Sequence, residues 1–274
     1  MALDRVVGDL RLPDAVRVVA DANPPDRAAG GYELEPPLAN RFCHLPYQPS
    51  ASEWIEGMTT GWSAPPASRA IASDPLRRSA MVATVTGFIA KRPDLLHVFP
   101  GAEHAAGGAV PGGAAPATSG GAWPSRRTWD MLASALAHLR EDDHAAIQAA
   151  TLGLVGEGVG VEFLTWRREA DLPDPAAVVA DPSIVTWTDR PDRVWAVLSG
   201  VVGWAATRGT VEAWREAWGP LLACAEHGAP DVAAAAARTL GRARPAKAAV
   251  PAAARRFQPV LVAAGLATAG TDAA

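Results

Sequence analysis

The chain has 274 residues, of which 49% are hydrophobic, so it is long enough for one large domain or two ordinary ones. Its net charge of −4 provides no long-range attraction for nucleic acid, and we expect no nucleic acid partner. No apolar run reaches the roughly 18 residues of a membrane span, and the N-terminal stretch MALDRVVGDLRLP carries acidic residues where a signal peptide is basic. We therefore expect a cytoplasmic protein without a membrane partner.

Strand character is confined to the first part of the chain. Residues 3–12 alternate around a turn at Gly8-Asp9 and predict a hairpin, and residues 15–20 form an apolar, β-branched run typical of a buried strand. Residues 42–47 could form another strand. The apolar strand ends in Asn23-Pro24-Pro25, and proline forbids a further ladder donor. Asn23 is thus expected at a strand tip, the place where a parallel sheet presents functional groups.

The rest of the chain has the pattern of helices. We expect helices capped by Ser52, Asp74 and Ser125, two helices divided at Gly156, and a break at residues 171–175. Residues 101–122 are rich in Gly, Ala and Pro without apolar periodicity, which predicts a mobile loop. Four further helices are expected to begin near Pro191, Thr210, Pro230 and Ala252. Trp214 and Trp218 stand at helical spacing, which favours core packing over ligand stacking.

Hydrolase and metal sites are not indicated. The six histidines are scattered, H-E-x-x-H and G-x-S-x-G are absent, and Cys43 and His44 are adjacent, so they would point to opposite faces of a strand. Cys43 and Cys224 have no C-x-x-C companion, and we expect two reduced thiols. We predict no metal ligand.

Two stretches carry a family resemblance. VVADANPPDRAAGGYELEPPLANRF, residues 18–42, resembles the part of MoxR-type AAA+ ATPases that runs from the sensor 1 strand to the arginine finger. WPSRRTWDML, residues 123–132, resembles their sensor 2 element, usually Ser-Pro-Arg at the start of a lid helix. The resemblance covers about the first 170 residues.

The resemblance implies roles for four residues. Asn23 would be sensor 1, which orients the water that attacks the γ-phosphate, and Arg41 would be the arginine finger that reaches a neighbouring subunit. Arg127 would be the sensor 2 arginine that contacts nucleotide, with Arg126 as the alternative, because Ser-Arg-Arg replaces Ser-Pro-Arg. Asn40 stands where Asp is usual before the finger. Implied cofactors are ATP and Mg²⁺, and implied partners are ring-forming subunits of the same family and a von Willebrand A domain protein.

The chain departs from this family in its phosphate-binding elements. It has only two lysines, Lys91 and Lys247, neither of which follows a glycine, so it holds no G-x-x-x-x-G-K-[ST] loop, and no Asp-Glu pair ends a strand. We therefore expect the C-terminal portion of an ATP-hydrolysing, protein-remodelling chaperone that is not an enzyme on its own.

The expected fold is mostly α. Residues 1–51 would be an incomplete α/β AAA+ core, a hairpin plus remnant parallel strands; residues 52–170 would be a helical lid, and residues 171–274 a helical C-terminal extension. Two alternatives stay open, namely a helical interaction or adaptor module without enzymatic function, and a truncated gene product.

Overall fold

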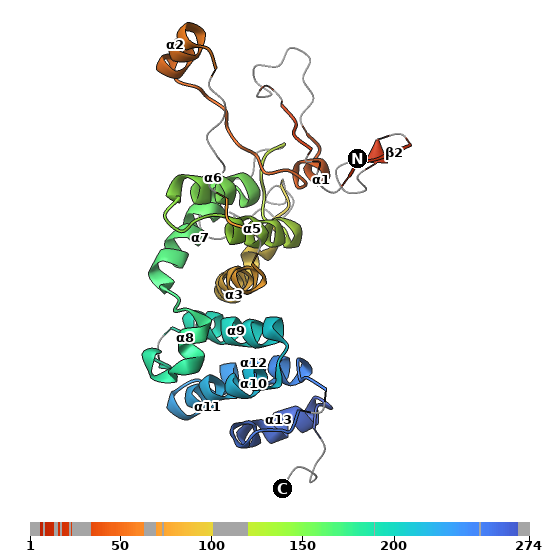
Figure 1. The fold of residues 1–274 in the computed structure, drawn as a ribbon, viewed down its shortest axis with the longest axis vertical. Helices are drawn as coiled ribbons and strands as arrows, with labels where there is room; N and C mark the ends of the chain where they lie inside the picture. The colour runs from red at the N-terminus through yellow and green to blue at the C-terminus, as the bar shows by residue number, and fades with distance from the viewer. Residues whose placement is uncertain are drawn as a thin grey trace, which may run out of the picture. The chain divides into compact units, whose positions relative to one another are not determined.

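The fold was obtained as a computed structural model, and it is mostly helical (Figure 1). It describes residues 6–7, 9–13, 16, 18–21, 23, 34–62, 70–72, 74–100, 120–188, 190–246 and 248–267. Within these residues no helix combines the length and apolar character needed to cross a bilayer. Most of the predicted loop at residues 101–122 lies outside the described residues, which resume at Gly120.

The only sheet among the described residues is the predicted N-terminal hairpin. Strands β1 (Val6–Val7) and β2 (Leu10–Arg11) pair antiparallel, with Val6 opposite Arg11. The predicted strands over residues 15–20 and 42–47 are wrong wherever the structure describes them. Val19 is 88% exposed, and no described segment pairs beside it, so its β-branched side chain has no sheet to join. No parallel pair occurs in the described part of the chain.

The chain divides into two compact units. One contains Met1–Pro66, Leu96–Leu132 and Gln148–Val161, and the other contains Ala67–Leu95, Ala133–Ile147 and Glu162–Ala274. Three helices contribute residues to both units: α5 (Arg126–His138), α6 (His144–Val155) and α7 (Glu157–Ala170). Gly156 separates α6 from α7 at φ 85°, and a Cβ there would lie 2.9 Å from the carbonyl oxygen of Ala122. The predicted division between two helices at Gly156 is confirmed. Both the positive φ and the close approach to Ala122 require a residue without a side chain at this position.

Two short helices belong entirely to the first unit. They are α1 (Pro36–Ala39) and α2 (Ala51–Thr60). Ser50, rather than the predicted Ser52, caps α2 through a capping box, in which Ser50 and Glu53 each bond the other's backbone N–H.

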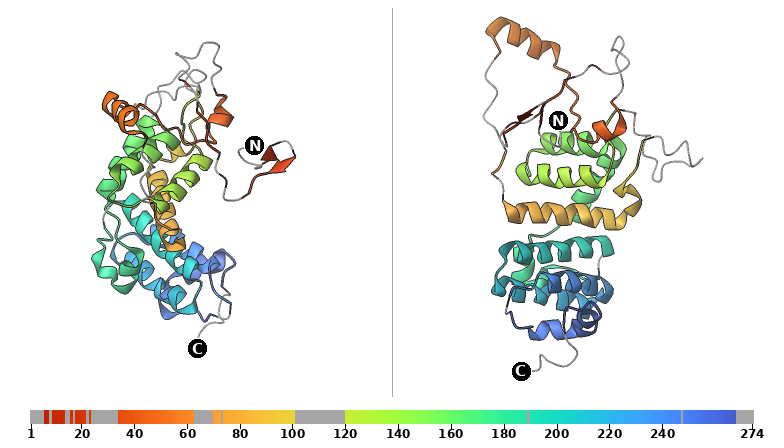
Figure 2. Two further views of the ribbon diagram at one scale, coloured as in Figure 1. Left: turned by 45° about the horizontal axis from the view of Figure 1, so that its top comes forward. Right: turned by 90° about the vertical axis from the view of Figure 1, so that its right-hand side faces the viewer.

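The second unit holds one long helix from the predicted lid and all the helices of the predicted extension (Figure 2). Asp74 caps α3 as predicted, and Pro191 and Pro230 open helices as predicted. The helices of the second unit are α3 (Pro75–Lys91), α8 (Pro175–Ala180), η3 (Pro182–Ile184), α9 (Pro191–Arg208), α10 (Val211–Glu216), α11 (Trp218–His227), α12 (Pro230–Arg242), η4 (Ala252–Phe257) and α13 (Gln258–Ala263). The short helix η2 (Pro93–Leu96) also lies in this unit, except for its last residue.

Helix α9 is the centre of this second unit. It lies between α3 and α12 (Figures 1 and 2), and the core on its α12 side includes Trp214 and Trp218, both essentially inaccessible. Their rings meet edge to face at 5.6 Å, so the prediction that these tryptophans pack in the core is confirmed. On the α3 side the helices approach closely, since a Cβ on Gly87 would lie only 2.4 Å from that of Ala196.

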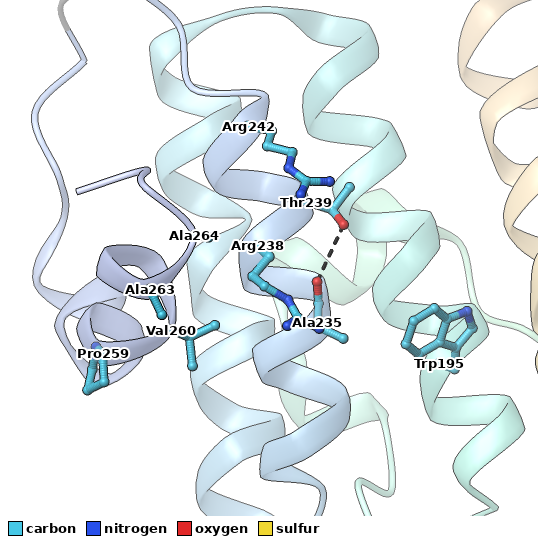
Figure 3. Close-up of a pocket in the computed structure, with 9 residues that line it drawn as sticks. All are labelled: Trp195, Ala235, Arg238, Thr239, Arg242, Pro259, Val260, Ala263 and Ala264. Carbon is cyan, nitrogen blue, oxygen red and sulfur yellow. Dashed lines mark hydrogen bonds between the residues drawn. The ribbon is translucent and has the colours of Figure 1, made fainter.

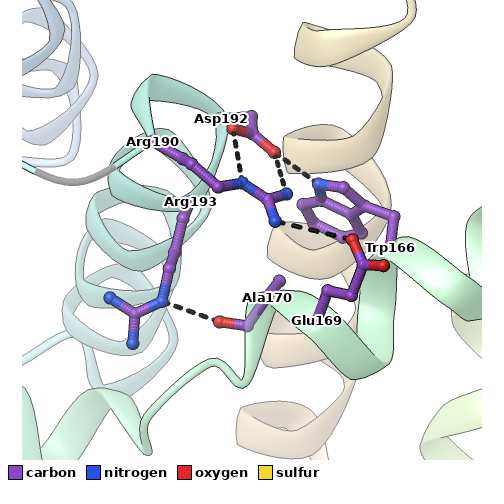
Figure 4. Close-up of polar contacts among 6 residues, drawn as sticks. All are labelled: Trp166, Glu169, Ala170, Arg190, Asp192 and Arg193. Carbon is purple, nitrogen blue, oxygen red and sulfur yellow. Dashed lines mark hydrogen bonds and ion pairs between the residues drawn. The ribbon is translucent and has the colours of Figure 1, made fainter.

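Polar contacts join the end of α7 to the start of α9 (Figure 4). The indole N–H of Trp166 donates to Asp192, whose carboxylate also accepts from Arg190 at 2.7 Å. Arg193 Nε donates to the carbonyl of Ala170 at 2.7 Å, and its Nη2 donates to that of Asp171 at 3.2 Å. Asp171 has φ 40°, which confirms that the helix breaks here.

Candidate functional site

The two stretches that carry the family resemblance meet within the first unit, at Asn40. Its side chain is buried, with 3% exposed, directly after α1. Nδ2 donates to the carbonyl of Trp123 at 3.1 Å, and Oδ1 accepts from the Ser125 hydroxyl at 2.6 Å. Both functional ends of the amide are thus used, and they join residues more than 80 positions apart in sequence.

The start of α5 is built by a reciprocal pair of hydroxyls. Ser125 Oγ accepts from the N–H of Thr128 at 3.2 Å, and Thr128 Oγ1 accepts from the N–H of Ser125 at 2.8 Å. Thr128 also donates to the carbonyl of Trp123, and the Trp123 indole donates to the carbonyl of Pro36 at 3.1 Å. The predicted cap at Ser125 is confirmed, and the same residue fixes α1 beside the beginning of α5.

The predicted finger residue follows Asn40 immediately. Arg41 is half-buried, and its guanidinium donates to the carbonyl of Pro37 within its own turn. The backbone N–H of Arg41 donates to the carbonyl of Leu38 at 3.0 Å. The position of the Arg41 backbone is therefore set by α1 and by the anchored Asn40.

The two candidate sensor 2 residues are the first residues of α5. Arg126 and Arg127 are both exposed, one and two positions after the buried Ser125. The Asn40–Ser125 hydrogen bond thus places the backbone that carries Arg41 next to the helix start that carries Arg126 and Arg127. Three guanidinium-bearing positions lie on segments held by one buried junction.

Asn23 is not brought into this junction. It is exposed, and the ten residues that follow it lie outside the described part of the chain. Asn40 is the residue to which sequence reasoning assigned no function. Its only signal was its place in Leu-Ala-Asn-Arg-Phe, where the resembled family has Asp.

The side chain of Cys43 contacts α6, and the side chain of His44 contacts α1. The Cys43 thiol donates to the carbonyl of Ala150 at 3.9 Å, and His44 Nε2 bonds the carbonyl of Ala39 at 2.9 Å. Although Cys43 as a residue is exposed, desolvation of its thiol raises its pKa, and burial raises the pKa of Cys224 to about 11. Both thiols are protonated near neutral pH and are weak nucleophiles.

The described residues contain no cluster of His, Cys, Asp or Glu able to hold a metal ion. The chain matches no family model, no curated protein and no solved structure. The site is therefore defined by its own geometry, a buried amide–hydroxyl junction that carries three arginines on its flanks.

Proposed function

We propose that this chain is the sensor-and-lid portion of a MoxR-type AAA+ ATPase, a protein-remodelling chaperone. In this assignment Arg41 is the arginine finger and Arg127, or Arg126, is the sensor 2 arginine. The supporting observation is the junction at Asn40, because one pair of side-chain hydrogen bonds joins the Leu-Ala-Asn-Arg-Phe segment to the Ser-Arg-Arg helix start. The junction places the segment that carries Arg41 beside the helix start that carries Arg126 and Arg127.

The residues present do not fit a complete site for ATP and Mg²⁺. The sequence has no phosphate-binding loop and no Asp-Glu pair, and the guanidinium groups supply charge but no cradle of backbone N–H groups. We therefore propose that the missing elements are supplied by sequence outside these 274 residues, and that the chain alone does not hydrolyse ATP.

The remaining assignments follow from the family. The assembled protein would act in the cytoplasm as a ring, with each Arg41 contacting the nucleotide of the next subunit, and one client class would be proteins with a von Willebrand A domain. Asn23 would contribute as sensor 1 beside the nucleotide.

The test begins with the coding sequence upstream of Met1. We expect it to encode a G-x-x-x-x-G-K-[ST] loop and an Asp-Glu strand, and we expect the extended protein to hydrolyse ATP. In that protein Arg41→Ala should lower kcat by about 10³ to 10⁵ without weakening ATP binding, because a finger contacts the transition state in trans. Arg256→Ala, at an exposed arginine of η4, is the matched control and should leave turnover unchanged.

Normal turnover in the Arg41→Ala variant would show that Arg41 is not a finger. An upstream sequence without these motifs would overturn the ATPase assignment as a whole. The interaction-module alternative would then stand, and it has one supporting observation: Trp54, Ile55 and Met58 on α2 are each more than half exposed.

A further inference from the structure

A groove of about 690 Å³ lies in the second unit, far in sequence from the three arginines of the candidate site (Figure 3). The exposed face of α12 forms its floor, and Trp195 of α9 stands on one side of this floor. The short helix α13 forms the other wall. The residues that line the groove are Trp195, Ala235, Arg238, Thr239, Arg242, Pro259, Val260, Ala263 and Ala264.

Two arginines of the floor supply the charge of this groove. Arg238 and Arg242 are four residues apart on α12, so both guanidinium groups start from the same face. Both are exposed, and neither forms a hydrogen bond or ion pair with the described residues. By contrast, Arg244 donates through Nε to the carbonyl of Ala248 at 2.8 Å.

No carboxylate lines the groove to compensate this charge. Six basic residues and no acidic residue occur between positions 232 and 271, although the whole chain has a net charge of −4. The nearest acidic residue on α12 is Asp231, seven residues before Arg238, or about 10 Å along the helix. The groove is therefore a local positive site in an acidic protein.

The walls are apolar and include one flat surface. Trp195 is only half-buried, and Pro259, Val260 and Ala263 of α13 lie on the other side of α12 from it (Figure 3). An indole face that is partly accessible can stack on a planar group, and apolar walls favour a ligand body without charge.

We propose that this groove binds a small organic anion, a phosphate monoester or carboxylate carried on a flat apolar body. The arginines would clamp the anionic group, because guanidinium donors pair with two oxygens at once, and the flat body would lie against Trp195. The volume falls within the range of about 300 to 1,000 Å³ typical of small-ligand pockets, and two arginines are too few for a polyanion surface.

The first experiment measures binding of three probes to the full 274-residue chain by calorimetry. The probes are 1-naphthyl phosphate, inorganic phosphate and 1-naphthalenemethanol, which present the whole ligand, the anion alone and the apolar body alone. We expect 1-naphthyl phosphate to bind with a Kd below about 1 mM and each fragment to bind at least tenfold more weakly. Absence of binding by 1-naphthyl phosphate would overturn the proposal.

The second experiment locates the site. Arg238→Gln and Arg242→Gln should each weaken binding of 1-naphthyl phosphate about tenfold, because each removes a charged hydrogen-bond donor. Trp195→Ala should weaken the aromatic probe and leave inorganic phosphate unaffected. The controls Arg255→Gln and Arg256→Gln change exposed arginines of η4 that lie in the same basic segment but outside the groove.

Equal losses in the controls and in the groove variants would overturn the proposal, since they would reveal a general effect of positive charge. Tighter binding of poly-glutamate than of 1-naphthyl phosphate would also overturn it, in favour of an acidic protein partner. Circular dichroism of each variant verifies that it is folded. The outcome is independent of ATP hydrolysis, so it neither requires nor tests the assignment of Arg41.

Discussion

The carboxylate of Asp192 accepts the indole N–H of Trp166 and so connects α7 to α9. Burial acts to raise the pKa of Asp192, but hydrogen bonds from Arg190 and Trp166 and the charges of Arg190 and Lys91 outweigh it and hold this pKa at about 2. The ordinary value for an unfolded chain is near 3.9, so the folded state favours the charged form. Asp192 therefore stabilises the fold at pH values above about 4, and this contribution is lost as the pH falls toward 2.

The change Asp192→Asn tests this linkage. It removes the charge and keeps the shape, and we expect it to lower the free energy of unfolding by about 2 kcal/mol between pH 5 and pH 8. The difference from wild type should shrink as the pH falls from 4 to 2, measured by urea titration at each pH. Asp21→Asn, at an exposed position outside any described helix or strand, should change stability by less than about 0.5 kcal/mol. A difference that persists at low pH would contradict the role of the charge.

Among the elements, α3 and α9 depend on small residues to approach one another. A Cβ on Gly87 would lie 2.4 Å from the Cβ of Ala196 and 3.2 Å from its Cα, and the second of these is a backbone atom that cannot rotate away. Glycine usually weakens a helix interior by about 1 kcal/mol relative to alanine. At Gly87 the close packing reverses that preference.

The pair Gly87→Ala and Gly219→Ala separates packing from helix propensity. Gly87→Ala should destabilise the protein by about 1 to 3 kcal/mol, because the added methyl overpacks the contact with α9. A Cβ added at Gly219, in the first turn of α11, would meet no atom within 4 Å, so Gly219→Ala should be neutral or stabilising by up to about 1 kcal/mol. Thermal unfolding measures both. Equal effects of the two substitutions would mean that α3 and α9 do not pack closely.

Many helix boundaries could be predicted because their signals are local. Asp74 before Pro75, Ser125 three residues before Thr128 and Gly156 at positive φ each act through neighbours in sequence. Helix α8 was missed because Asp174-Pro175 was interpreted only as a break, whereas Asp174 caps the helix that Pro175 begins. Proline can end one helix and can also open the next, so a proline alone does not tell whether a break or a new helix follows.

The candidate site was less accessible to sequence reasoning. Arg41, Arg126 and Arg127 were selected through the family resemblance, and their roles stay predictions. The junction that joins their segments depends on Asn40 and Ser125, which are 85 positions apart and carry no local signal for one another. The predicted strand at residues 15–20 failed because β-branched composition indicates a strand only where a neighbouring strand can pair with it.

At the scale of the whole molecule, the chain is organised as two compact units, each with its own anchoring contact. The Asn40 junction lies within the first unit, and the contact of Gly87 with Ala196 lies within the second. Each anchor should therefore govern the local stability of its own unit.

Hydrogen exchange measured by mass spectrometry on full-length variants tests this organisation. Asn40→Leu removes two buried hydrogen bonds and should accelerate exchange in α1 and in the first turns of α5, while Gly87→Ala should accelerate it in α3 and α9. Asn23→Leu, at an exposed asparagine, is the matched control for the first variant and should leave exchange unchanged. Acceleration throughout the chain in either variant would indicate one cooperative unit.

The turn at Asp171 has a consequence for how the protein is made. Its left-handed backbone is unfavourable for a residue with a side chain. The carbonyl oxygens of Ala170 and Asp171 both accept hydrogen bonds from Arg193, which lies 22 residues after Asp171. A ribosome synthesises α7 and this turn before it has added Arg193. The two hydrogen bonds that Arg193 donates to this turn can therefore form only after the first turn of α9 has left the exit tunnel.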